Sequence, residues 1–137
     1  MNITTFDDLL QAARQQANAQ RLLLVFAVAG IPNDSTPEQR ARFAAGEGGE
    51  LTPLMCVDKT PDELQSFAAL AEESRQFGQA WTLVFAAAMS GQGDQAPSTE
   101  QAQPLLEGMV QAIKDGRLSS FIPFDREGQA VSLQAGR

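Results

Sequence analysis

The chain has 137 residues, of which 43% are apolar and 20% charged, and its formal net charge is −7. This length and composition are typical of one globular domain, so we expect residues 1–137 to form a single domain and exclude wholesale disorder. The excess of negative charge repels phosphate backbones and anionic lipid, so we expect neither nucleic acid nor a membrane as a partner.

The first half of the chain predicts two helices separated by a buried strand. Thr4 or Thr5 caps a first helix, whose apolar positions recur at helical spacing as far as Ala17. Residues 21–29 form an unbroken apolar run that is too short for a typical helix, which indicates a central strand. A second capping pattern predicts a short helix over 38–45.

Residues 51–88 predict a strand, a helix and a second strand. The threonine–proline–glutamate pattern at 60–63 marks the helix start, and Gly78 suits the left-handed residue that ends a helix. Residues 81–88 are almost continuously apolar, as in a strand that is covered on both faces. We therefore expect a right-handed β-α-β crossover with strands 51–57 and 81–88 parallel.

The last third predicts a helix that runs to about residue 115, followed by a hairpin over 121–133. Pro104 must either start or kink this helix, while Pro53 and Pro123 favour edge positions for their strands. The whole pattern predicts an α/β fold, with α+β as the alternative. It has three main helices and a mixed sheet of about four to five strands, with 21–29 and 81–88 interior.

Two residue counts exclude whole classes of chemistry. The chain has no histidine and one cysteine, Cys56. This removes Ser-His and Cys-His nucleophile pairs, imidazole ligands, thiolate clusters and any intrachain disulfide. We therefore expect no metal site and no cofactor, and the sequence leans against an enzyme. Apolar residues on both sides of Cys56 predict a buried, unreactive thiol.

Two further patterns have structural explanations that we favour. Gly91, Gly93 and Ala96 fit a dinucleotide-binding pattern, but Asp94 adds a like charge and Pro97 interrupts the helix entry, which indicates a surface loop. Paired carboxylates also occur, and the helix dipole and solvent-facing ion pairs account for them. Those at the predicted helix start are Asp58, Asp62 and Glu63, and those further along are Glu72 and Glu73.

Any small-ligand site is expected at the carboxyl ends of strands 21–29 and 81–88, where open α/β sheets bind ligands. Neutral hydrogen-bonding side chains there are Ser35, Thr36, Ser90 and Ser98, the last two bounding loop 90–98. Acidic residues in the same loops disfavour anionic ligands such as ATP or NAD. A separate candidate is an exposed contact patch formed by Phe121 and Phe124.

Four segments together resemble a family of short proteobacterial proteins often labelled ribonucleotide reductase subunit alpha. They are RLLLVFAVAG, LTPLMCVDK, EESRQFGQAW and FIPFDREG, and the resemblance covers essentially the whole chain. The resemblance implies a bacterial, cytoplasmic protein but no activity. A reductase large subunit is several times longer and uses several cysteines for radical chemistry, so no catalytic residue is transferred.

The function expected from the sequence is non-enzymatic binding of a protein partner, through an exposed edge strand or the Phe121–Phe124 patch. The alternative is a small-ligand-binding domain or minor enzyme with its pocket at the strand ends given above. The N-terminus has no basic segment leading into an apolar one, and the apolar runs are too short to span a bilayer. A cytoplasmic location is therefore expected.

Overall fold

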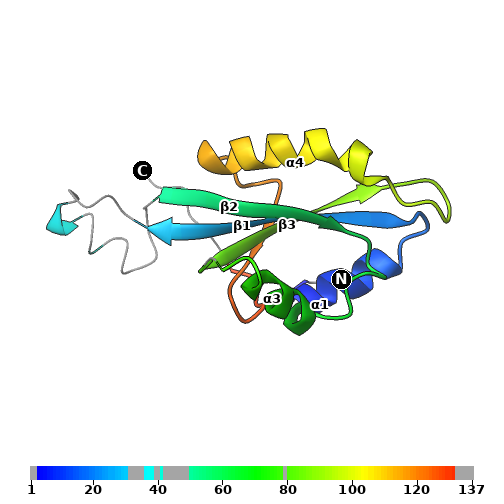
Figure 1. Ribbon diagram of the computed structural model, residues 1–137, viewed down its shortest axis with the longest axis horizontal. Helices are drawn as coiled ribbons and strands as arrows, with labels where there is room; N and C mark the ends of the chain where they lie inside the picture. The colour runs from blue at the N-terminus through cyan, green and yellow to red at the C-terminus, as the bar shows by residue number, and fades with distance from the viewer. Residues whose placement is uncertain (1–2, 31–35, 39–40, 42–49, 79, 132–137) are drawn as a thin grey trace.

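The computed structural model describes residues 3–30, 36–38, 41, 50–78 and 80–131. These form three helices and four strands, a mixed α/β fold of the expected class (Figure 1). In chain order the elements are α1 (Phe6–Arg14), β1 (Gln20–Gly30), β2 (Glu50–Lys59), α3 (Phe67–Arg75), β3 (Leu83–Ser90), α4 (Thr99–Lys114) and β4 (Ile122–Phe124).

The four strands form one sheet in the order β2-β1-β3-β4, and every neighbouring pair is antiparallel. The expected mixed sheet is therefore antiparallel instead. Because β2 and β3 are each antiparallel to β1, they run in the same direction with β1 between them. The parallel strand–helix–strand unit is thus confirmed, with one strand inserted in its middle. β1 and β3 are interior, as expected, and β2 lies at one edge.

Side chains alternate across the sheet and build two cores. On one face Leu22, Leu24 and Phe26 of β1 pack with α1 and α3. On the other face Leu23 and Val25 pack beneath α4. The molecule is therefore three layers, with α1 and α3 below the sheet and α4 above it in Figure 1. This two-sided cover explains the continuous apolar run at 21–29.

The C-terminal hairpin is confirmed over its described part and closes the β4 side of the sheet. Phe124 bridges Ala130, and Gln129 bridges Thr5 near the N-terminus. The turn needs glycine at Gly128, where φ is +82° and a Cβ would lie 2.8 Å from a ring carbon of Phe67. The N-terminal segment and the hairpin therefore cover this edge.

Several predicted boundaries differ from the structure. α1 ends at Arg14, short of Ala17, and β3 begins at Leu83, two residues after its predicted start. α4 begins at Thr99, so Pro104 lies inside it. Gly78 has the predicted positive φ, at +69°. The short helix expected over 38–45 lies almost entirely outside the described residues.

The start of α3 was also predicted wrongly. The pattern at 60–63 forms only a turn, in which Glu63 accepts hydrogen bonds from the backbone and hydroxyl of Thr60. α3 itself begins at Phe67, with Ser66 as its cap. Side chains at both places satisfy free backbone N–H groups, so the local pattern does not decide which of them starts the helix.

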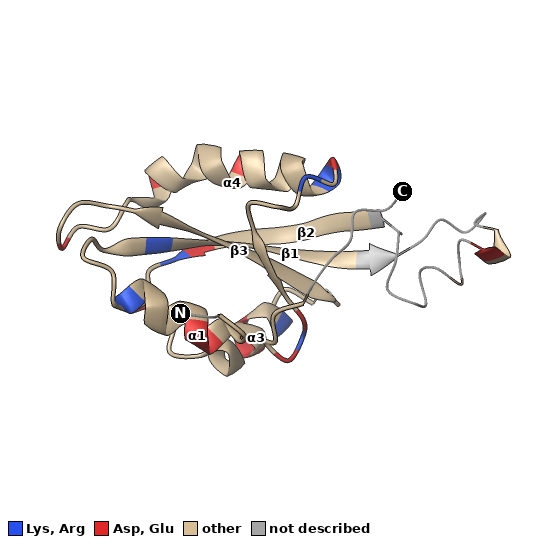
Figure 2. Ribbon diagram, turned by 180° about the vertical axis from the view of Figure 1, so that it is seen from behind, with Lys and Arg blue, Asp and Glu red and all other residues tan. Residues whose placement is uncertain are grey.

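Charged residues lie mainly on the helices and loops, whereas the strands are mostly uncharged (Figure 2). In β2, the stretch between Leu51 and Val57 carries no charge, and Asp58 and Lys59 follow at its end. Within the described residues, no helix is both long and apolar enough to cross a membrane.

Candidate functional site

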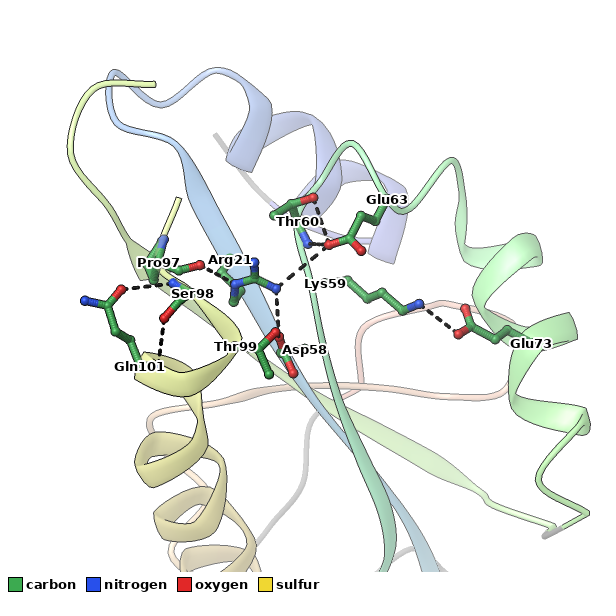
Figure 3. A network of polar contacts seen from close by, with 10 residues as sticks. All are labelled: Arg21, Asp58, Lys59, Thr60, Glu63, Glu73, Pro97, Ser98, Thr99 and Gln101. Atoms are coloured by element: carbon green, nitrogen blue, oxygen red, sulfur yellow. Dashed lines mark hydrogen bonds and ion pairs between the residues drawn. The ribbon is translucent and has the colours of Figure 1, made fainter. Parts of the chain in front are cut away.

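Arg21 of β1 is the centre of a polar network that joins two strands to the start of α4 (Figure 3). Its Nη1 lies 2.7 Å from Oδ2 of Asp58 on β2, and its Nε donates to the carbonyl of Pro97. The hydroxyl of Thr99 donates to the same Oδ2 at 2.7 Å. The side chains of Arg21 and Asp58 are only 14% and 13% exposed. These contacts are sufficiently explained by anchoring α4 to the sheet.

The carboxylates near this network are also engaged in structural contacts. The hydrogen bond from the Thr60 backbone is the main cause that lowers the pKa of Glu63. Glu73 pairs with Lys59 at 2.8 Å, and Glu72 pairs with Arg75 at 2.7 Å. No group of three potential metal-binding side chains occurs among the residues that the structure describes. Ion pairs therefore account for the two glutamates of α3. The helix dipole that was expected to explain Asp62 and Glu63 is absent there, because these residues lie in a turn before α3.

The glycine-containing loop after β3 packs against the turn between α1 and β1. The N–H of Gly91 donates to Ala19, and the N–H of Gly93 donates to the side chain of Asn18. A Cβ at Gly91 would lie 1.9 Å from the carbonyl oxygen of Gln95, so the tight turn requires glycine there. Because these amides already have partners, the loop offers no phosphate cradle in this conformation.

The strand ends expected to bring the candidate ligand-binding residues together lie apart. Since β1 and β3 are antiparallel, Ser90 at the carboxyl end of β3 pairs with Gln20 at the start of β1. The carboxyl ends of the two strands therefore lie at opposite ends of the sheet, and the expectation of one site between them is wrong.

Taken singly, these residues have different settings. Ser90 accepts a hydrogen bond from Gln20, and Ser98 caps α4. Thr36 is exposed, and Ser35 lies outside the described residues. The two described serines therefore already take part in contacts within the chain.

The proposed Phe121–Phe124 patch is not an exposed surface. Phe124 is fully buried, and its ring packs edge-on against Phe6 at a centroid distance of 5.3 Å. Phe121 is half-buried against the core beneath α4. The expectation failed because the N-terminal segment and α1 cover this part of the hairpin, a long-range contact that the local sequence does not show.

Cys56 is exposed, contrary to the expectation of a buried thiol. It lies on the outermost strand, and its side chain shares the α4 face with Val25, its partner on β1. Partial burial is the main cause that raises the thiol pKa, and the negative charges of Asp58 and Glu107 add to it. The thiol is therefore accessible but not activated as a nucleophile.

An open apolar groove of about 990 Å³ lies beside α4. Its walls include Leu105 and Met109 of α4, Ala87 of β3 and the segment 116–121. The groove was not predicted from the sequence. The available signal was the pair of alanines at 87–88 on β3 together with Gly108 on α4, because small side chains on facing elements leave space between them.

The longest unpaired edge among the described residues is the outer side of β2. Nine of the ten residues of β2 pair with β1 on one side, and no described strand pairs with the other. Leu51, Leu54, Met55 and Val57 are only partly buried there, beside the exposed Cys56. Pro53 is the one residue of this edge without an N–H group.

Comparison with protein-family models, with curated proteins and with solved structures finds no match for this chain.

Proposed function

We propose that the protein is a non-enzymatic interaction module that binds a partner strand along the outer edge of β2. The observation that carries this proposal is the ten-residue edge with no described strand beside it. Exposed strand edges present free backbone donors and acceptors and are natural sites for strand addition. The partly buried apolar side chains of β2 supply contacts that a partner strand would cover.

Other features of the chain support this proposal over an enzyme. The chain has no histidine, and the best-formed polar network, around Arg21, is accounted for by its role in anchoring α4. The buried position of Phe124 removes the other contact surface predicted from the sequence. The proposed setting is the bacterial cytoplasm, as the resemblance to short proteobacterial proteins implies.

A pair of matched variants tests the proposal. Thr52 is exposed on β2 and Ala69 is exposed on α3, so Thr52→Lys and Ala69→Lys make the same change of charge on different surfaces. A lysine on an edge strand opposes strand addition. Partners captured from the native bacterium should be lost with Thr52→Lys and retained with Ala69→Lys. Equal capture by both variants would contradict the proposal.

A second candidate function is favoured by the groove beside α4, which is large enough for a small apolar ligand. Gly108 lines it, and a Cβ there would meet nothing within 4 Å. We expect the apolar dye ANS to bind the intact chain, Gly108→Ala to retain binding, and Gly108→Leu to reduce it by filling the groove. Unchanged binding with Gly108→Leu would exclude the groove as the site.

A further inference from the structure

The geometry of β2 points to a specific partner, and this inference rests on the proposed function. We propose that the strand added at the edge of β2 is β2 of a second copy of the chain. The two strands run antiparallel about a two-fold axis, and Leu54 lies opposite the partner's Met55. The result is one continuous sheet through both copies, with an isologous interface.

A β-bulge in the middle of β2 is the basis for this register. Phe26 pairs with Met55 and Ala27 pairs with Pro53, so Leu54 is the extra residue. The bulge reverses the alternation of side chains between the two halves of the strand.

The side chains that point towards α4 are therefore even-numbered on one side of the bulge and odd-numbered on the other. After the bulge, Cys56 and Asp58 lie opposite Val25 and Leu23, whose side chains point towards α4. Before the bulge, the residues on that face are the odd-numbered ones, Pro53 among them, because Pro53 pairs with Ala27. The α4 face thus carries even-numbered residues in one half and odd-numbered residues in the other.

Opposed residues in a sheet must project from the same face, so this reversal restricts how β2 can pair with itself. With Leu54 opposite the partner's Met55, every opposed pair along the strand lies on a common face. A slip of one residue in either direction mismatches every pair except the central one. A slip of two residues mismatches only the central pair but leaves two residues of each strand unpaired. The bulge therefore leaves one register in which all ten residues pair on matching faces. The resulting pairs are Leu51 with Asp58, Thr52 with Val57, Pro53 with Cys56 and Leu54 with Met55.

The charge pattern of β2 agrees with the same register. No charged residue lies between Leu51 and Val57, so the net negative charge of the chain does not accumulate in the centre of the interface. Like charges at opposed positions destabilise a strand pair, and the opposed pairs from Leu51–Asp58 to Leu54–Met55 contain none. Pro53 donates no hydrogen bond, so we expect a reversible dimer.

The single native cysteine makes the register measurable. Pro53→Cys should form disulfide-linked dimers in oxidised glutathione, because position 53 lies opposite the partner's Cys56. Opposed Cα atoms in antiparallel strands are about 4.5–5.5 Å apart, within the range that a disulfide spans. The unaltered chain and Thr52→Cys should stay uncrosslinked, since their cysteines are not opposed. Crosslinking of either control in preference to Pro53→Cys would overturn the register.

Sedimentation equilibrium of the intact chain tests self-association independently of oxidation. We expect a concentration-dependent increase towards twice the monomer mass of 14.7 kDa. Thr52→Lys should weaken this association at least tenfold, whereas Ala69→Lys should not change it. A chain that remains monomeric at millimolar concentration would overturn self-pairing. If β2-dependent capture of another protein persisted in that case, the proposed function would stand and only the identity of the partner would be wrong.

Discussion

At the scale of single residues, the buried pair of Trp81 and Ser74 connects the end of α3 to the entry of β3. Nε1 of Trp81 donates to the Ser74 hydroxyl at 2.8 Å, and that hydroxyl donates to the carbonyl of Ala71 at 2.6 Å. Trp81 also packs edge-on against Phe26, with ring centroids 5.0 Å apart. The Ser74 side chain is only 2% exposed, and its hydroxyl both donates and accepts a hydrogen bond within the core.

We expect Ser74→Ala to destabilise the fold by about 1–3 kcal/mol, because the indole N–H would lose its acceptor in a buried site. Trp81→Phe removes that donor, so the double variant should be more stable than the sum of the two single effects predicts. Urea denaturation of all four chains measures the coupling. Strictly additive effects would show that the hydrogen bond does not contribute to stability.

The Asp8 carboxylate gives a prediction about pH. Hydrogen bonds from the side chain and backbone of Thr4 and the backbone of Thr5 lower its pKa below the ordinary value of 3.8. Because the folded-state pKa is depressed, its stabilising effect is complete above 3.8 and is lost as the pH falls through the folded-state pKa.

Asp8→Asn should therefore reduce stability at neutral pH and lose that difference in acid. Denaturation midpoints at a series of pH values measure it, and Asp94→Asn removes the same charge from an exposed loop as a control. A difference from the unaltered chain that stays constant into acid would contradict the assignment.

Residue-scale expectations failed where burial depends on distant parts of the chain. The apolar neighbours of Cys56 are real, but its strand is outermost, which leaves the thiol exposed. Phe124 looked exposed beside Pro123, but Phe6 covers it. Strand position and long-range cover are properties of the assembled sheet, so the local pattern does not contain them.

At the scale of elements, apolar periodicity and capping residues predicted most of the structure. The runs that became β1 and β3 were found because both faces of these strands are covered, which makes them continuously apolar. α4 was found from its apolar spacing, although the pattern did not distinguish whether Pro104 lies at its start or inside it. The start of α3 was misplaced because a four-residue capping pattern also suits an isolated turn.

The cap of α4 gives an element-scale prediction. Ser98 accepts from the backbone of Gln101, and the Gln101 side chain accepts from the backbone of Ser98. Ser98→Ala should therefore lower the free energy of unfolding by about 1 kcal/mol, and Ser98→Asp should retain most of it. Chemical denaturation provides the measurement. Equal losses in both variants would show that the side-chain oxygen is not the stabilising group.

At the scale of the whole molecule, the sequence predicted the class of fold and the two interior strands but not the strand directions. The helix α3 joins the parallel strands β2 and β3, as expected, yet β1 lies between them and is antiparallel to both. Which strand lies between two others depends on pairing between segments that are far apart in the sequence, and local sequence patterns do not show this pairing. The same rearrangement separates the carboxyl ends of β1 and β3 and leaves β2 at an outer edge of the described sheet.

The most direct test of the account is an NMR dilution series on the intact chain that follows each backbone amide from micromolar to millimolar concentration. We expect concentration-dependent shifts and slower amide exchange in β2, centred on Leu54 and Met55, with little change in α3. Shifts confined to the groove segment 116–121, or no concentration dependence in β2, would contradict the claim that the edge of β2 is a self-pairing surface.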